Sequence, residues 1–156
     1  MPVEKLKRYL DDNGVKYVTI NHSKAYTAQE VAASAHIPGK EVAKTVMVKI
    51  DGKMAMAVLP ASYSVDFEEL KNVTGAATAE LAAEDEFRDL FPECDVGAMP
   101  PFGKLYDMPT FMAASLAEDE LIAFNAGSHT ELIQMSFTAY ERLAEPIELR
   151  FSLEPA

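Results

Sequence analysis

The chain has 156 residues, with 49% hydrophobic and 25% charged residues, which is typical of one globular domain and not of a disordered chain. Cys94 is the only cysteine, which excludes an internal disulfide and a cysteine-cluster metal site. The net charge of −11 argues against a protein that grips long nucleic acids, because such binding needs a broad basic surface, but it permits contact with a nucleic-acid end.

The sequence has no apolar run long enough to span a bilayer and no secretory signal at its charged N-terminus. We therefore expect one domain over residues 1–156, a cytoplasmic location, and no membrane or DNA partner.

In the first half of the chain, hydrophobic spacing and turn residues predict helices around a hairpin. The expected elements are a helix over 2–13, a strand over 17–21, a helix over 27–35, strands over 43–50 and 54–60, and a helix from 66 to 75. The hairpin has the clearest signal, because Asp51-Gly52 accepts positive φ at the turn.

In the second half, strands are expected to predominate. The expected elements are a helix over 81–90, a loop over 94–106, strands over 110–112, 121–125 and 131–137, a helix capped by Thr138, and a strand over 147–153. The inward residues should be Phe87 and Leu90 in the helix, with Phe91 as a further candidate, and Ile147, Leu149, Phe151 and Leu153 in the last strand. This mixture predicts an α+β fold, a mixed β-sheet with flanking helices. No glycine-rich phosphate loop follows any strand.

Lys44 is the most informative single residue. Alternation along its strand places it on the same apolar face as Val42, Val46 and Val48. A lysine there costs desolvation unless it reaches water or meets an anion. Two interpretations follow: the side chain extends out to solvent, or it points a cation into a cleft that holds a phosphate or polarises a carbonyl.

Two loops are further candidates. In the segment Gly97 to Gly103, the glycines permit unusual backbone angles while Pro100-Pro101 fixes φ, so the turn can present backbone groups in a fixed geometry. In the turn Asn125 to Thr130, His129 could donate to a substrate oxygen or position a water molecule. Stiff loops without a ligand and exposed histidines are both common, so neither feature identifies a site alone.

Other chemistries have little support in the sequence. His22 and His36 have no cysteine or carboxylate at ligand spacing, so we expect no metal site. No serine lies in a nucleophile elbow. Glu93 and Asp95 flank Cys94 and should raise the pKa of its thiol, which disfavours a thiolate nucleophile.

Five segments occur together in a specific order: Tyr26 to Ala32, Val42 to Val46, Val58 to Pro60, Gly97 to Gly103, and Ala126 to His129. In these segments the chain resembles the YbaK and prolyl-tRNA-synthetase-associated family of aminoacyl-tRNA deacylases, over roughly residues 15–143. The resemblance implies trans-editing: hydrolysis of the ester bond of mischarged aminoacyl-tRNA, typically tRNA for proline that carries a small wrong amino acid.

The resemblance also implies a site. The expected catalytic residues are Lys44, Gly97, Pro101 and His129, and the expected substrate-binding residues are Tyr26, Thr45, Gly127 and Ser128. Lys44 would bind the terminal phosphate or backbone of the substrate, and the Gly-x-x-x-Pro loop would shape the pocket around the ester. The expected partners are the acceptor end of aminoacyl-tRNA and a prolyl-tRNA synthetase, with no cofactor.

The chemistry agrees with this inventory. An aminoacyl ester is already activated, so positioning water and stabilising the oxyanion can supply much of the rate without a protein nucleophile or a metal. Selectivity would be steric, because a pocket for small side chains rejects larger ones.

Two departures from the family pattern matter. Many relatives have an aspartate where this chain has Ala113, and some alanine-specific relatives have an asparagine where it has Thr45. The first departure leaves open a non-catalytic binding module for an aminoacyl-adenosine or a related small ligand. A structural adaptor that uses the acidic surface is a third alternative, and it predicts no pocket around Lys44.

Overall fold

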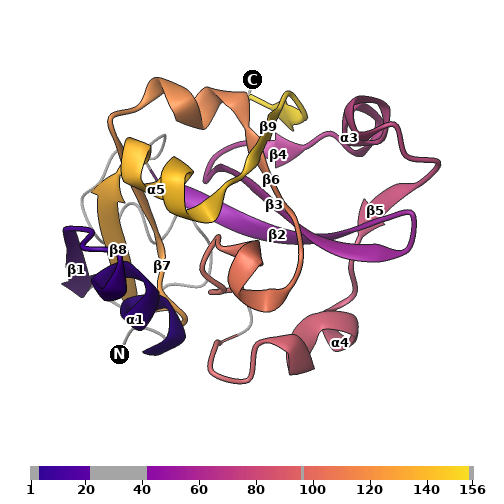
Figure 1. Cartoon of the computed structure of the whole chain (residues 1–156). Coiled ribbons are helices and arrows are strands. Elements are labelled where there is room, and N and C mark those ends of the chain that lie inside the picture. Colours follow the sequence, from indigo (N-terminus) through magenta and orange to yellow (C-terminus); the bar gives the residue numbers. More distant parts are fainter. Residues whose placement is uncertain (1–3, 22–41, 96, 155–156) are drawn as a thin grey trace.

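The computed structural model describes residues 4–21, 42–95 and 97–154. Its helices and strands, in chain order, are α1 (Glu4–Asp12), β1 (Tyr17–Asn21), β2 (Val42–Ile50), β3 (Lys53–Pro60), β4 (Ser64–Val65), α3 (Phe67–Thr74), β5 (Ala79–Leu81), α4 (Glu84–Phe87), β6 (Thr110–Ala113), β7 (Leu121–Asn125), β8 (Glu131–Ser136), α5 (Phe137–Ala144), β9 (Ile147–Leu149) and β10 (Ser152–Leu153) (Figure 1). Short 3₁₀ turns cover Arg88–Leu90, Gly103–Tyr106 and Ala114–Glu118.

Most of the described strands form one mixed sheet in the order β1-β8-β7-β2-β3-β6-β9. Strand β2 pairs with β3 antiparallel along its whole length, from Ala43 opposite Pro60 to Ile50 opposite Lys53. Parallel pairs join β2 to β7, β3 to β6 and β6 to β9. The predicted α+β architecture with a mixed sheet is confirmed.

The second edge of β2 is shared by two strands. At its start, Val42 and Ala43 pair with Ala123 and Phe124 of β7, whereas at its end Val48–Ile50 pair with β5. Within the described residues, Lys44, Thr45 and Val46 therefore have no strand partner on this edge. The sheet forks at the point where β7 leaves β2.

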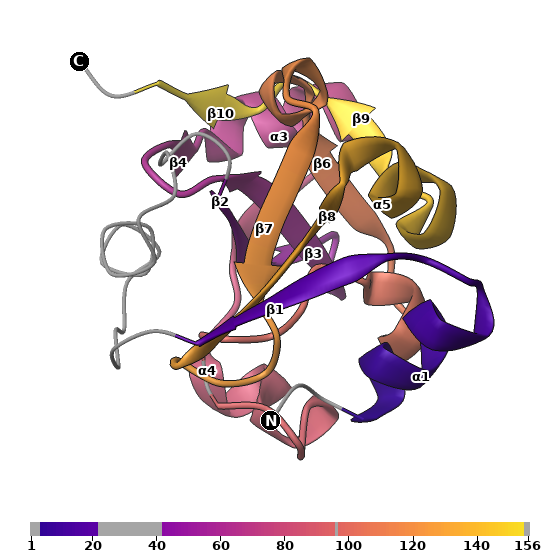
Figure 2. The same ribbon diagram turned by 90° about the vertical axis from the view of Figure 1, so that its left-hand side faces the viewer.

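Both faces of the sheet are covered. One face packs Ala43 and Met47 into a core with Leu6 and Leu10 of α1 and Tyr140 of α5. Helices α1 and α5 lie together beside β1 and β8 (Figures 1 and 2), and the Tyr9 hydroxyl joins them by donating to the Leu143 carbonyl at 2.8 Å.

The other face of β2 carries Val46, Val48 and Ile50, as the alternation predicts, and it packs against the fully buried Leu70 of α3. Truncation of such a side chain to alanine costs about 2–5 kcal/mol, so the apolar contacts fix both layers around β2.

Local signals account for the elements that bound the hairpin and α3. Asp51 and Gly52 both have positive φ, of 50° and 80°, as a two-residue hairpin turn requires. The Asp66 side chain accepts from the Glu69 amide at 3.1 Å and so caps α3, which ends at the left-handed Gly75. These predictions are confirmed, as is the strand over 17–21.

Three predicted elements are wrong in part. The helix over 81–90 is shorter, because Leu81 instead pairs with Val48 in β5; Phe87 and Phe91 are buried as expected, but Leu90 is 44% exposed. Ser136, not Thr138, caps α5, by accepting from the Ala139 amide.

The strand expected over 147–153 is two strands in different sheets. Its backbone leaves β6 after Leu149, and β10 pairs with β4 instead. Phe151 is buried, whereas Ile147 and Leu153 are 48% and 53% exposed, so the continuous inward face is wrong. The helix expected over 27–35, with Tyr26, His22 and His36, lies outside the described residues. Among the described helices, none is both long and apolar enough to cross a bilayer.

Candidate functional site

Lys44 lies at the fork of the sheet. Because Ala43 pairs with Phe124 in a parallel ladder, Lys44 and Asn125 are the next residues on their two strands, and both alternate to the face opposite Phe124. Asn125 ends β7, and the turn that carries His129 follows directly. The topology therefore brings Lys44 alongside the start of this turn.

The Lys44 side chain is half-buried. Burial lowers the pKa of its ammonium group below the ordinary 10.5, and no charge on a described residue contributes to this shift. Among the described residues, Lys44 has no ion-pair partner, whereas Lys49 on the same strand pairs with Glu86 at 2.7 Å. Lys44 is thus a partly desolvated cation that the described part of the chain does not neutralise.

The loop that begins at Gly97 lies against the His129 turn. The Asp95 amide donates to the Gly127 carbonyl at 2.8 Å, and the Gly127 amide donates to the Ala98 carbonyl at 2.9 Å. A methyl group on Gly97 would lie 3.6 Å from His129 Cε1. The structure therefore brings Gly97 together with Gly127 and His129, which follow it by thirty or more positions along the chain.

Positive φ angles explain the two glycines. Gly97 has φ of 85° and Gly127 has φ of 104°, a region that other residues rarely adopt. Gly97 is exposed, and its amide makes no hydrogen bond within the described part of the chain, so this N–H is available to a ligand.

The far end of the same loop is fixed from the core. The fully buried Tyr140 of α5 donates its hydroxyl to the Pro101 carbonyl at 2.8 Å, and the Gly103 amide donates to Thr110 Oγ1 at 2.9 Å. Phe102 packs edge-on against Tyr140, with ring centroids 5.2 Å apart. These contacts anchor the far end of the loop and hold Pro101 in the core.

The expected substrate-binding residues are placed less uniformly. Ser128 is half-buried, and its hydroxyl lies 3.3 Å from that of Thr130 within the turn. Thr45 is next to Lys44 in sequence but alternates to the opposite face, with Ala43 and Met47. The Thr45 side chain therefore does not share the face of Lys44.

Asn125 is a residue that the sequence did not single out. Its amide oxygen is buried and has no hydrogen-bond partner in the described part of the chain. Because a buried acceptor without a donor is costly, such an atom marks a place where a ligand group can bind. Its only signal in the sequence is its position before the His129 turn.

Ala113 and Cys94 have structural roles. Ala113 is fully buried and packs in the core layer with Leu70 and Phe151, so its surroundings are apolar. Burial, more than the flanking Glu93 and Asp95, raises the pKa of the Cys94 thiol to about 11. The expected direction is confirmed, although its main cause is desolvation.

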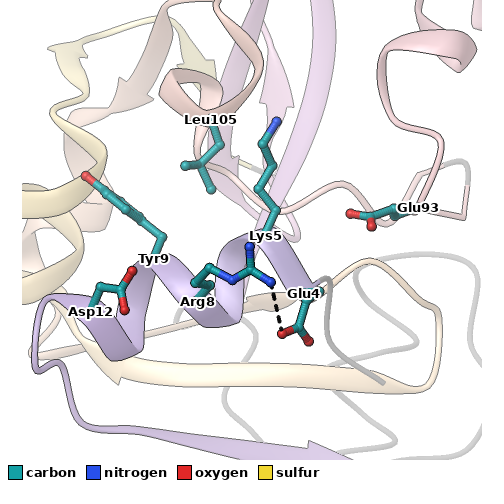
Figure 3. A pocket seen from close by; sticks show the side chains of 7 residues that line it. All are labelled: Glu4, Lys5, Arg8, Tyr9, Asp12, Glu93 and Leu105. Atoms are coloured by element: carbon teal, nitrogen blue, oxygen red, sulfur yellow. Dashed lines mark ion pairs between the residues drawn. The ribbon is translucent and has the colours of Figure 1, made fainter.

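A concavity of about 520 Å³ lies on α1 and is completed by Glu93 and Leu105 (Figure 3). Its lining includes Lys5 and Arg8 together with Glu4, Asp12 and Glu93, so its charges largely cancel. The Lys5 ammonium also lies 4.8 Å from the centre of the Tyr106 ring, and Arg8 pairs with Glu4. None of the candidate catalytic residues lines it, and we do not assign it to the site.

Comparison with known families gives one match. The model of the family described as aminoacyl-tRNA editing domain matches residues 22–143, which include every residue discussed above as part of the site.

Curated relatives are proline–tRNA ligases. The enzyme of Bacillus mycoides strain KBAB4 is 31% identical over 80 residues, and that of Bacillus cytotoxicus is 34% identical over 80 residues. Each match covers 51% of this chain and 14% of the ligase, so the chain corresponds to a small part of these enzymes.

Solved structures share the fold. The hypothetical protein APE2540 superposes with a TM-score of 0.85 at 18% identity, covering 96% of this chain and 100% of its own. A protein described as a candidate trans-editing enzyme for prolyl-tRNA synthetase superposes with a TM-score of 0.80 at 16% identity, covering 96% and 95%. At these identities the likeness establishes the fold alone.

Proposed function

The chain belongs to the aminoacyl-tRNA editing domain family, and we propose that it hydrolyses the ester bond of mischarged aminoacyl-tRNA in trans. The observation that carries this proposal is the contact of the Gly97 loop with the His129 turn, near the Lys44 cation, which no described residue pairs. A cation from β2, together with a backbone donor and an imidazole from the adjoining loop and turn, suits an ester whose carbonyl becomes an oxyanion.

In this mechanism, water attacks the carbonyl carbon of the ester, the bond to the ribose oxygen breaks, and that oxygen takes a proton to leave as a hydroxyl. The Gly97 amide donates to the developing oxyanion. Lys44 binds the phosphate of the terminal nucleotide and so fixes the ester against the loop. His129, which is only 6% exposed, orients the attacking water.

The proposed substrate is tRNA for proline that carries a small non-cognate amino acid such as alanine, cysteine or serine. The similarity to proline–tRNA ligases supports this choice. With a net charge of −11, the chain suits contact with the acceptor end only, and a prolyl-tRNA synthetase that delivers the tRNA would supply the remaining affinity.

A non-catalytic binding module is the second candidate. The apolar, fully buried Ala113 favours it, because the acid that many relatives carry there is missing. Such a module would bind an aminoacyl-adenosine without cleaving its ester.

Release of amino acid from a panel of mischarged tRNAs separates the two. We expect release above the buffer rate, loss of this activity in Lys44→Met, and its retention in Lys49→Met, a matched control on the same strand whose ammonium pairs with Glu86. Both substitutions keep the apolar stem of the side chain. No release from any tRNA, together with tight binding of a non-hydrolysable aminoacyl-adenosine, would favour the binding module. Full activity in Lys44→Met would remove Lys44 from the mechanism.

A further inference from the structure

The fork between β2 and β7 holds two complementary groups. Lys44 is a half-buried cation with no anionic partner among the described residues. Asn125, its neighbour on β7, has a buried amide oxygen that accepts no hydrogen bond from that part of the chain. The cation and the acceptor thus follow the last paired residues of two neighbouring strands, and within the described residues each lacks the group that it would bind.

The end of an aminoacyl-tRNA offers the two matching groups. Its terminal nucleotide carries a phosphate. The amino acid carries an α-ammonium group on the α-carbon, next to the ester carbonyl. The phosphate suits Lys44. The α-ammonium group needs an acceptor, since a site that holds a lysine cation would otherwise repel it.

We propose that Asn125 is a substrate-binding residue, whose amide oxygen accepts a hydrogen bond from the α-ammonium group of the aminoacyl moiety while Lys44 holds the phosphate. This inference rests on the proposed function and deepens it, because it makes the free amino group a recognised part of the substrate.

The side chain suits this role in two ways. Asn125 is half-buried as a residue, and the terminal torsion of an asparagine side chain is broad, so its amide can reorient toward a ligand without moving the backbone. The amide is also neutral, so it leaves the Lys44 cation free for the phosphate, whereas a carboxylate at this position would pair with Lys44 and neutralise it.

Binding of two non-hydrolysable ligands tests the inference without turnover. The first is an adenosine 5′-monophosphate with alanine joined to its 3′ position through an amide; the second carries a propionyl group instead and lacks only the amino group. Calorimetry compares their affinities for the wild-type chain, for Asn125→Ala and Asn125→Leu, and for Asn72→Leu, a control that removes an exposed amide from α3.

We expect the wild-type chain and Asn72→Leu to bind the alanyl ligand about tenfold to a hundredfold more tightly than the propionyl ligand, the effect of a hydrogen bond to a charged group. Either substitution of Asn125 should abolish this preference and leave the affinity for the propionyl ligand unchanged. Thermal melts identify a variant that does not fold, in which case the other variant decides.

An unchanged preference in a folded Asn125 variant would overturn the inference. An equal loss of affinity for both ligands in an Asn125 variant would also overturn it, because Asn125 would then act on Lys44 or on the ribose. The inference also fails if the wild-type chain binds neither ligand. If the preference depends on Asn125 while no tRNA is deacylated, the hydrolytic function fails and the inference about Asn125 holds. If tRNA is deacylated and the preference does not depend on Asn125, the hydrolytic function holds and the inference about Asn125 fails.

Discussion

The hydrogen bond between Tyr140 and Pro101 allows a test of how the core holds the candidate site. Tyr140 is fully buried, and its hydroxyl donates to the Pro101 carbonyl at 2.8 Å. The substitution Tyr140→Phe removes one oxygen atom and keeps the ring that packs on Phe102 and Phe124. The only polar change is therefore at the Pro101 carbonyl.

The cost follows from burial. Pro101 is buried, so its carbonyl loses its donor where water does not replace it, and such an unpaired acceptor costs about 1–3 kcal/mol. In a domain of this size, about 2 kcal/mol corresponds to a fall in Tm of roughly 4–8 °C. Because Pro101 belongs to the loop that contacts the His129 turn, we expect deacylation to weaken as well.

Thermal and urea unfolding followed by circular dichroism measure this effect. The control is Tyr106→Phe, whose hydroxyl lies 3.9 Å from the Cys94 sulfur, a weak contact that should be worth less than about 0.5 kcal/mol. If Tyr140→Phe is no less stable than Tyr106→Phe, the hydroxyl does not anchor the loop and the reasoning is refuted.

Three further predictions follow from the site. Gly97→Ala and Gly75→Ala should each lower the free energy of unfolding in urea by about 1–2 kcal/mol, because each glycine has positive φ. Only Gly97→Ala, whose methyl group would contact His129, should lower the deacylation rate, and equal rates in the two variants would contradict this. Burial lowers the pKa of Lys44 in the folded chain below 10.5, so the unfolded chain binds this proton more tightly. The wild-type chain should therefore gain stability relative to Lys44→Met as the pH rises through the lowered pKa toward 10.5, and urea titrations at about pH 8 and about pH 10 should show the gain. The pKa of Cys94 is raised from 9.0 to about 11, so its alkylation by iodoacetamide near pH 8 should be about a hundredfold slower than that of a free thiol. Alkylation at the rate of a free thiol would show that the Cys94 thiol is not buried.

Elements with strong local signals were predictable from the sequence. The turn at Asp51-Gly52 and the cap at Asp66 each depend on a few neighbouring residues, so their conformations follow from local chemistry. Alternation in β2 was also readable, and it separates Lys44 from Thr45 onto opposite faces.

Elements whose form depends on distant partners were not predictable. Leu81 continues a helical pattern in the sequence, but in the structure it pairs with Val48 as part of a strand. None of its sequence neighbours indicates this pairing. Likewise, Phe151 is drawn into the core beside Leu70, which breaks the alternating run from Ile147. Tertiary packing decided both cases.

The candidate site was predictable only through the family resemblance. Gly97, Gly127 and His129 do lie together, although their spacing along the chain does not show it. Asn125 was missed because its importance arises from an absent hydrogen-bond donor, a property of the folded chain and not of the sequence.

The fork in the sheet also has a consequence for folding kinetics. The pairing of β2 with β3 needs only a two-residue turn, and such hairpins form within about 1–10 μs. The pairing of Val42 with Ala123 must instead close about half of the chain into a loop, which is slow because the entropy is lost before the contact is gained. We therefore expect a refolding chain to form the β2-β3 hairpin first, and to bind ligand only after this long-range closure.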